Sequence, residues 1–253
     1  MDGTAGQNAL RRIARNGNAR PLGLFIASID PATTEIAADA GFDFAMIDAE
    51  HAPQDRLTVL GHVRAAEARG IVPLARILDS SNHMIQSMLD VGVKGVVVPK
   101  VESGAEAERI VAATRYAPAG KRGMCPACHD GRYTVVDFKN RMARRNSEVL
   151  AIPIIETVKG VENIEEIVAV DGMDIIHFGP GDLSADMGID LNTELDKLQD
   201  AWVRVRDASH AAGKAVLVPS GMGFEGGDAL SLPMELMILH STLTSMVGDM
   251  RKI

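Results

Sequence analysis

The stretch of sequence that decides the fold runs Ile175-Ile176-His177-Phe178-Gly179-Pro180-Gly181-Asp182-Leu183-Ser184. It is typical of a buried strand, a tight Gly-Pro-Gly turn and an acid where a helix begins. Asp182 is therefore expected just beyond the carboxyl end of the strand, beside free backbone N–H groups that can bind an anion. Its carboxylate could cap the helix or bind a divalent cation. The rest of the chain decides between these two interpretations.

Outward from this stretch, short apolar runs alternate with helical segments along the chain. Strands are predicted at residues 22–28, 43–48, 71–76, 95–98, 149–156, 174–178, 215–218 and 234–239. Helices are predicted at residues 7–16, 31–40, 55–68, 81–91, 105–113, 161–168 and 193–212, and from residue 241 onward. Continuous apolar strands separated by helices indicate a parallel sheet covered by helices. Eight such units favour a single α/β domain over residues 1–253, a closed (β/α)8 TIM barrel with a short N-terminal helix; a doubly wound open sheet is the alternative.

Charge and composition limit the possible partners. The chain has 26 Lys and Arg against 34 Asp and Glu, a formal net charge of −8. This balance argues against binding to nucleic acid or to an anionic membrane surface. No apolar run approaches the roughly 20 residues of a membrane span, and the first residues do not resemble a signal peptide. Two cysteines suggest no disulfide framework, which suits the cytoplasm.

Polar residues interrupt or follow the apolar strands at one end. Asp48, Arg76 and Glu156 end predicted strands, and Asp182 follows another. Barrel enzymes keep their active sites at the carboxyl ends of the strands, so this convergence favours a ligand role for Asp182. Glu156 and Asp182 come from neighbouring strands. Two carboxylates that leave the other coordination positions to water and substrate oxygens suit Mg²⁺, Mn²⁺ or Co²⁺ better than structural zinc. The alternative for Glu156 is an ion pair with a lysine such as Lys159.

The other candidate residues are expected to move protons or to stabilise charge. Arg76 offers a fork of donors to a developing oxyanion, with a salt bridge to an acid at the rim as the alternative. His51 follows Asp48 by three positions, and a carboxylate that orients the imidazole would make it a general base. Asp90 could join this pair or could be solvated. No lysine is expected at the strand ends to form a Schiff base.

Two further segments are unusual. Residues 115–134 show little periodicity and are expected to form a loop on the active face, as a lid, a substrate-binding loop or an oligomer contact. Within it, Cys125-Pro126-Ala127-Cys128-His129 matches a haem-attachment pattern. Because no export signal is expected, we interpret this match as coincidence, with a reactive thiol pair as the alternative. The basic residues at 141–145 are expected on a solvated helix face or in a subunit contact.

Several motifs, spread in order over residues 20–220, resemble the HpcH/HpaI aldolase family of metal-dependent class II pyruvate aldolases. The matching segments are residues 41–43, 47–53, 89–92, 115–123, 155–157 and 179–184. The resemblance implies a barrel, a divalent metal on Glu156 and Asp182, and pyruvate chelating that metal. It implies proton transfer by His51 with Asp48, Arg76 at the pyruvate oxygen, and a homo-hexamer built as a trimer of dimers. Asp90 is assigned to catalysis, and Arg122 and Gly181 to substrate binding.

The sequence also departs from the family. Many members have Gln two residues before the metal-binding Glu, where this chain has Ile154, and the chain diverges after Ser220. The predicted activity is reversible cleavage of 4-hydroxy-2-oxo acids to pyruvate, or a related 2-oxo acid, and an aldehyde that the sequence does not identify. The alternatives are a decarboxylase or acyl-CoA lyase of the same superfamily, and a non-catalytic protein that binds 2-oxo acids.

Overall fold

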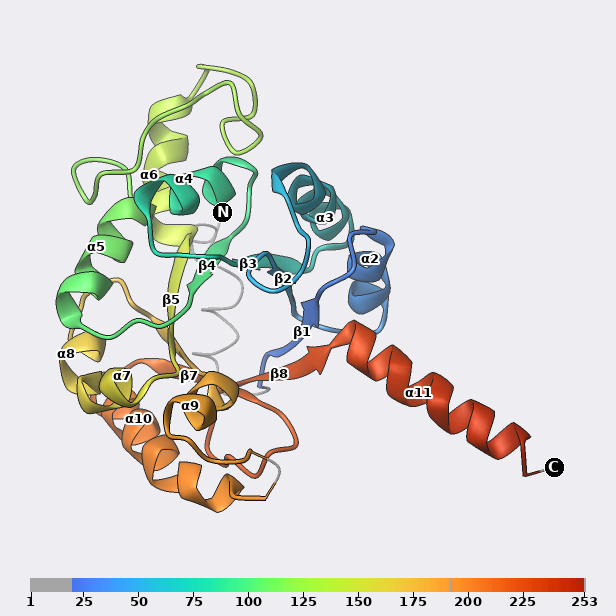
Figure 1. Ribbon diagram of the computed structural model, residues 1–253. Helices are drawn as coiled ribbons and strands as arrows, with labels where there is room; N and C mark the ends of the chain where they lie inside the picture. The colour runs from blue at the N-terminus through green and yellow to red at the C-terminus, as the bar shows by residue number, and fades with distance from the viewer. Residues whose placement is uncertain (1–19, 192, 253) are drawn as a thin grey trace.

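The computed structural model describes residues 20–191 and 193–252, and within them the sheet closes into a barrel of eight parallel strands in chain order (Figure 1). The fold class predicted from sequence is confirmed. The strands are β1 (Leu22–Ile26), β2 (Phe44–Asp48), β3 (Val72–Arg76), β4 (Gly95–Val98), β5 (Leu150–Ile155), β6 (Ile175–Phe178), β7 (Ala215–Pro219) and β8 (Ala229–Met234). The helix predicted at residues 7–16 lies outside the described residues.

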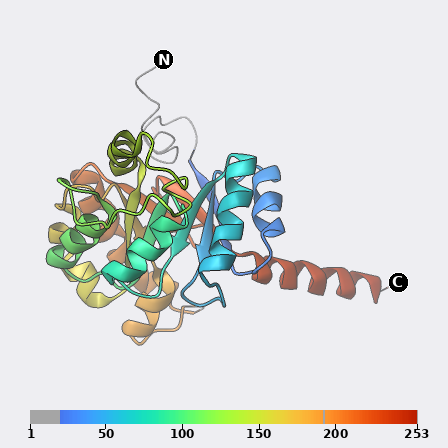
Figure 2. The ribbon, with the colours of Figure 1, turned by 90° about the horizontal axis from the view of Figure 1, so that it is seen from above.

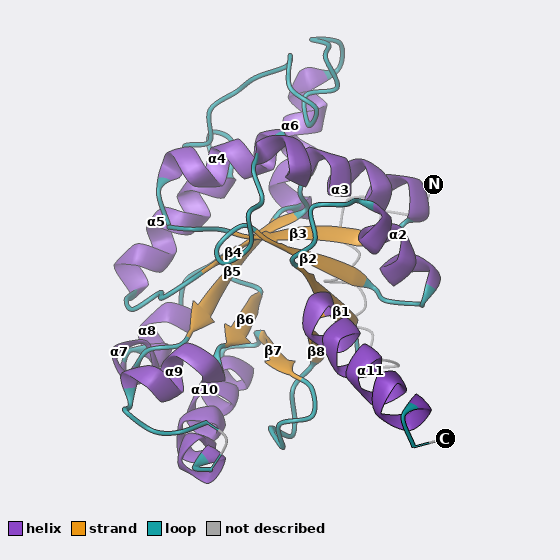
Figure 3. Cartoon of the chain, turned by 45° about the vertical axis from the view of Figure 1, so that its right-hand side comes forward, coloured by secondary structure: helices purple, strands orange, loops and turns teal. Residues whose placement is uncertain are grey.

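Helices follow the strands, and all but the last of them lie around the barrel (Figure 3). They are α2 (Ala32–Asp39), α3 (Arg56–Arg69), α4 (Asn82–Asp90), α5 (Gly104–Thr114), α6 (Phe138–Glu148), α7 (Val158–Glu162), α8 (Ile164–Val168), α9 (Pro180–Asp186), α10 (Gln199–Ala211) and α11 (Glu235–Met250). A short 3₁₀ helix, Leu195–Leu198, precedes α10. In the described residues, no helix is both long and apolar enough to span a membrane.

The barrel interior is filled by apolar side chains from alternate strand positions, including Phe44, Met46, Leu74, Ile152 and Leu217. A second apolar layer lies between the strands and the surrounding helices. The close packing of the interior requires a glycine in β1. A Cβ atom on Gly23 would lie 2.0 Å from the Phe44 ring, so the phenyl group fills the space that a side chain on β1 would need.

The end of the chain differs from the sequence prediction. The eighth strand is Ala229–Met234, and the predicted strand at residues 234–239 is wrong, because Glu235–Met250 is a helix. Strand β8 pairs with β1 and β7, so it closes the barrel. Its sequence, Ala-Leu-Ser-Leu-Pro-Met, alternates buried and partly exposed positions, whereas the more continuous apolar run just after it attracted the strand prediction.

Helix α11 extends away from the barrel (Figures 1 and 2). None of its residues is buried, although its sequence is strongly apolar. The large apolar side chains that it exposes are Leu236, Met237, Ile238, Leu239, Leu243, Met246, Val247 and Met250. An exposed apolar surface of this extent is typical of a protein–protein contact.

The connection between α5 and α6 lies at the amino-terminal end of the barrel. Arg122 pairs with Asp90 at the end of α4, at 3.1 Å, and His129 pairs with Glu67 near the end of α3, at 3.1 Å. The ends of these helices lie beside the starts of the next strands, opposite the carboxyl ends. The prediction that this loop belongs to the active face is therefore wrong for the single chain. Both of its cysteines are free thiols.

Two arginines of α6 are buried, contrary to the predicted solvated face. Arg141 donates to the carbonyl oxygens of Gly131 and Val136, the latter at 3.0 Å. Arg145 donates to the carbonyl oxygen of Val93 at 3.0 Å and pairs with Asp130 at 2.7 Å. Arg141 thus ties the end of the long loop to α6, and Arg145 joins the loop, through Asp130, to Val93 just before β4.

Candidate active site

Four of the predicted site residues lie at the carboxyl ends of the strands. Asp48 is the last residue of β2, Arg76 the last of β3, and Glu156 directly follows β5. Asp182 lies in the first turn of α9, immediately after β6. Neighbouring strands keep in-register pairing, so their ends form one mouth. The four residues therefore lie where the sequence predicted, at the end of the barrel at which (β/α)8 enzymes in general bind substrate.

A buried ion pair forms one side of the mouth. Arg76 donates through Nε and Nη2 to the two carboxylate oxygens of Asp48, at 2.9 and 2.8 Å. Asp48 is fully buried. Burial alone would lower the pKa of Arg76, but the hydrogen bond to Asp48 and the charges of Asp48, Glu50 and Glu156 raise it. The guanidinium is therefore a fixed positive charge in a rigid orientation.

Glu156 forms the opposite side. Its residue is 4% exposed, and its Oε1 accepts the backbone N–H of Lys100 at 2.8 Å. Burial, reinforced by the charges of Asp182 and Glu50, raises the pKa of Glu156 to about 7, against the hydrogen bond from Lys100 and the charge of Arg76. Carboxylates that repel one another in this way bind a cation readily, because a cation relieves the repulsion.

Asp182 is not the cap residue of its helix, because the N-cap of α9 is Gly179 and Asp182 is the third helical residue. Its carboxylate is 42% exposed and pairs instead with the ammonium of Lys100, at 3.4 Å. Lys100 follows β4 by two residues, so the prediction that no lysine lies at the strand ends is wrong. The position of Lys100, a charged residue just after the apolar run of β4, was a signal that it could belong to the site. The alternation of strands and helices did not show which way its side chain points.

The two carboxylates fit a hard divalent cation. Across residues 20–191 and 193–252, no three His, Cys, Asp or Glu side chains are grouped so as to hold a metal ion. Sites for Mg²⁺ commonly use one or two carboxylates and leave the other positions to water and substrate oxygens. Glu156 and Asp182 supply oxygen donors of this kind, and the charge of Asp182 adds to burial in raising the pKa of Glu156.

Gly179 makes room for the carboxylate of Glu156. A Cβ atom at Gly179 would lie 2.7 Å from Glu156 Cβ and 2.8 Å from its Oε2. We expect Gly179→Ala to displace this carboxylate and to weaken Mn²⁺ binding by about tenfold or more, the usual loss when a ligand is poorly positioned. Gly181→Ala is the matched control, because its added Cβ meets no described atom within 4 Å. Isothermal titration calorimetry measures both, and equal affinities for the two variants would contradict this account.

The imidazole of His51 is positioned differently from the sequence prediction. Asp48 Oδ1 accepts the backbone N–H groups of Glu50 and His51, at 3.1 and 3.4 Å, so it orders the main chain of this turn. The imidazole Nε2 lies 3.6 Å from Glu50 Oε2, and its side chain is 55% exposed. Burial and the charges of Asp48 and Asp182 raise the pKa of Glu50, against Arg76 and His51. In the described contacts, Glu50 rather than Asp48 faces the ring, and sequence reasoning gave this acid no role.

Asp90 and Arg122 lie elsewhere in the single chain. The Arg122 guanidinium is buried between Asp90, at 3.1 Å, and Asp130, at 2.9 Å, and stacks on the Tyr116 ring. This cluster is at the amino-terminal end of the barrel, so one chain does not bring it to Glu156 and Asp182. A catalytic part for Asp90 and a substrate-binding part for Arg122 stay predictions.

His177 lies in the barrel interior beneath the mouth. It occupies the strand position two residues before Gly179, beside Ile154 of β5. Its ring centroid is 6.1 Å from that of Phe25, over which the Arg76 guanidinium is stacked at 4.9 Å. Burial, with a smaller contribution from the charge of Arg76, lowers the pKa of His177 to about 3. The imidazole is therefore neutral at physiological pH.

This buried imidazole gives the stability a defined pH dependence. The unfolded chain binds a proton here below the ordinary pKa of 6.5, whereas the folded chain does so only near 3, so acid favours unfolding across that window. As the pH falls through this window, one such group lowers the free energy of unfolding by up to about 1.4 kcal/mol for each pH unit. We expect the free energy of unfolding of His177→Phe, measured by urea denaturation with EDTA, to depend less on pH than that of the wild type, by this slope. His83→Phe, on the exposed surface of α4, is the control, and parallel wild-type and His177→Phe curves would contradict the assignment.

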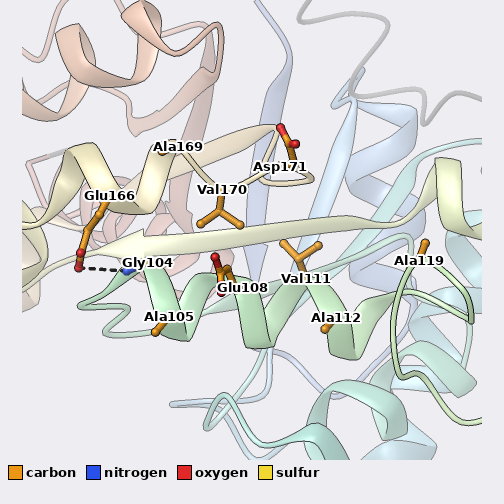
Figure 4. A pocket seen from close by; sticks show the side chains of 10 residues that line it. All are labelled: Gly104, Ala105, Glu108, Val111, Ala112, Ala119, Glu166, Ala169, Val170 and Asp171. Carbon is orange, nitrogen blue, oxygen red and sulfur yellow. Dashed lines mark hydrogen bonds between the residues drawn. The ribbon is translucent and has the colours of Figure 1, made fainter.

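An open groove of about 590 Å³ lies on the outside of the barrel, between α5 and α8 (Figure 4). Its acids are Glu108, Glu166 and Asp171, and Glu166 accepts the backbone N–H of Gly104 at 3.1 Å. None of the predicted site residues lines it. Its negative walls do not suit an anionic substrate, so the strand ends remain the candidate active site.

The chain is similar to known proteins of one family. The family model described as HpcH/HpaI aldolase/citrate lyase matches residues 21–219. A hydroxypyruvate/pyruvate aldolase of Pseudomonas aeruginosa is 36% identical over 81% of this chain and 78% of its own length. A 2-keto-3-deoxy-L-rhamnonate aldolase of Salmonella gallinarum is 31% identical over 84% of this chain and 80% of its own.

A solved structure shows the same likeness in three dimensions. The crystal structure of an HpcH/HpaI aldolase/citrate lyase family protein from Burkholderia cenocepacia J2315 superimposes with a TM-score of 0.89. It is 26% identical and covers 97% of this chain and 100% of its own. The resemblance seen in the sequence motifs is confirmed. The chain belongs to the HpcH/HpaI aldolase/citrate lyase family.

Proposed function

We propose that this protein reversibly cleaves 4-hydroxy-2-oxo acids to pyruvate, or a related 2-oxo acid, and an aldehyde. The chain is a carbon–carbon lyase, as its relatives named aldolase are. The observation that carries the proposal is the meeting of Glu156, Asp182 and Arg76 at one mouth, where two anionic ligands face a fixed cation. This arrangement can hold a 2-oxo acid and stabilise negative charge that develops on it.

The site residues have separate proposed parts. Glu156 and Asp182 would hold a divalent cation, Mg²⁺, Mn²⁺ or Co²⁺, which when bound supplies Lewis acidity to the 2-oxo group. Backbone N–H groups near Gly181 and Asp182 would hold the substrate carboxylate. Arg76 donates through Nε and Nη2 to Asp48, and its Nη1 would donate to the oxygen that becomes negative as the C3–C4 bond breaks.

His51 is proposed to remove the proton of the 4-hydroxyl group, directly or through water. Its exposed ring lies at the rim, where an aldehyde would leave, and Glu50 is the carboxylate that faces it. Asp48 contributes by holding the backbone of this turn and by orienting Arg76. Because Asp48 is fully buried, it is a positioning residue in this proposal.

Proton exchange at C3 of pyruvate tests the proposal without knowledge of the aldehyde. In D₂O with Mn²⁺ or Mg²⁺, the protein is expected to exchange these protons at a rate that NMR can follow. EDTA should abolish the exchange and His51→Ala should lower it. A protein that merely binds 2-oxo acids would show no exchange, and that result would overturn the proposal. A panel of aldehydes with pyruvate would then identify the second substrate.

Lys100 makes a Schiff-base mechanism the alternative to exclude. Its ammonium lies at the mouth, 3.4 Å from Asp182, although it is an exposed amine in an ion pair and not a desolvated one. We expect borohydride with pyruvate to leave the protein mass unchanged. A covalent adduct on Lys100, detected by mass spectrometry, would show that the reaction passes through an imine and would contradict the metal-dependent mechanism.

We also propose that the protein is a homo-oligomer, a hexamer built as a trimer of dimers, and that it works in the cytoplasm. The apolar helix α11 supports self-association, because a second copy is the partner always available to cover it. Sedimentation velocity is expected to show a hexamer. Leu243→Glu with Met246→Glu, two changes on the exposed helix, should shift the protein toward smaller species, and a monomeric wild type would contradict the proposal.

A further inference from the structure

The backbone of Lys100 is fixed beside the two carboxylates. Its φ is 52°, in the left-handed region that residues other than glycine adopt rarely and only where their surroundings hold them. Its N–H binds Glu156 Oε1 at 2.8 Å, and the next residue, Val101, donates its N–H to the carbonyl oxygen of Ile154 at 3.3 Å. The segment after β4 is thus attached to β5, and Lys100 cannot leave the site by a simple loop movement.

The side chain of Lys100 reaches the second carboxylate. Its ammonium lies 3.4 Å from Asp182 Oδ1, and the side chain is 58% exposed, so the contact is on the solvent side of the site. Arg76, a second cation at this mouth, is held by both oxygens of Asp48. Lys100 therefore supplies the positive charge that faces Asp182, with its backbone on one carboxylate and its ammonium on the other.

We propose that Lys100 sets the affinity of the site for its divalent cation by competing with it for Asp182. A protonated amine has no lone pair, so it cannot join the ligand set, and it repels a cation placed beside it. The ammonium must therefore leave Asp182 when the cation binds. This inference rests on the proposed function only through the assignment of Glu156 and Asp182 as ligands.

Equilibrium binding of Mn²⁺ tests this competition, with free Mn²⁺ followed by electron paramagnetic resonance. Lys100→Met keeps the backbone N–H on Glu156 and removes the charge. We expect it to bind Mn²⁺ up to about fivefold more tightly than the wild type, because an exposed ion pair of this kind no longer has to be broken. The gain should shrink at high ionic strength because screening weakens the competition.

Three further variants make the result specific. Lys100→Arg retains the charge and is expected to bind Mn²⁺ within about twofold of the wild type, and Lys100→Gln repeats the neutral substitution with a polar side chain. Lys159→Met is the matched control, since Lys159 is a similarly exposed lysine of α7 that pairs with Glu102 at 3.1 Å. It should leave the affinity unchanged. Equal tightening in Lys159→Met would mean a general charge effect and would overturn the proposal.

The outcomes also separate this inference from the proposed function. If Glu156→Gln and Asp182→Asn weaken Mn²⁺ binding but both neutral Lys100 variants bind as the wild type does or more weakly, the competition is wrong and the ligand assignment stands. If Glu156→Gln and Asp182→Asn leave binding unchanged, the ligand assignment fails, and the proposed function fails with it.

Discussion

Glu156→Gln and Asp182→Asn are each expected to lower kcat/KM for aldol cleavage by at least about 1,000-fold, because a bound cation supplies several kcal/mol of charge stabilisation. The two substitutions keep the size of the side chain and remove an anionic ligand. A coupled assay of pyruvate release measures the loss. Glu102→Gln, which removes an acid that pairs with Lys159, is the control and should retain activity.

Glu156→Gln is expected to lose activity but to gain stability at alkaline pH. The folded protein holds this carboxyl with its pKa raised to about 7, from an ordinary 4.5, so its contribution to stability is present below pH 4.5 and is lost as the pH rises through 7. At pH 8 with EDTA, the variant should therefore be more stable than the wild type, by on the order of 2 kcal/mol. A variant that is inactive and also less stable would indicate a structural role for Glu156.

Arg76→Met is expected to cost both activity and about 3 to 5 kcal/mol of stability, because it leaves the buried carboxylate of Asp48 without its partner. Asp48 is fully buried and binds both Nε and Nη2 of Arg76. Urea denaturation measures the loss of stability. Pyruvate C3 exchange measures the loss of activity, expected at 100-fold or more for removal of a charge-stabilising donor.

A double variant separates the two effects. Asp48→Asn together with Arg76→Met removes both charges, so most of the lost stability should return while activity stays low. Such non-additivity is the expected behaviour of residues in direct contact. Recovery of activity in the double variant would show that Arg76 acts only by supporting the fold, and would contradict its proposed position at the reacting oxygen.

The barrel and the main site residues could be predicted because both follow from local pattern. Alternating apolar strands and helices determine the layer structure, and a parallel barrel brings every strand end to one face. Asp48, Arg76, Glu156 and Asp182 could therefore be grouped before any coordinates were known. The contacts among these residues were harder to predict, since Arg76 pairs both with Asp48 at the end of a strand and with Glu50 in the following turn.

The failures have equally physical causes. Lys100 was missed because its direction depends on a left-handed backbone conformation after β4, which composition does not reveal. Asp90 and Arg122 lie in other segments that match the family, and the single chain pairs them at the opposite end of the barrel, so their parts in the reaction stay predictions. The eighth strand was predicted too far along the chain because the apolar start of α11 resembles a buried strand. The helix instead extends from the barrel and buries none of its residues.

A crystal soaked with Mn²⁺ and pyruvate, measured for anomalous scattering, tests the central claim most directly. We expect one strong anomalous peak at the mouth of the barrel, within about 2.5 Å of a carboxylate oxygen of Glu156 and of Asp182, with the keto and carboxylate oxygens of pyruvate completing the contacts. A peak that touches only one of these residues, a peak at another position, or pyruvate bound without the cation would contradict the account.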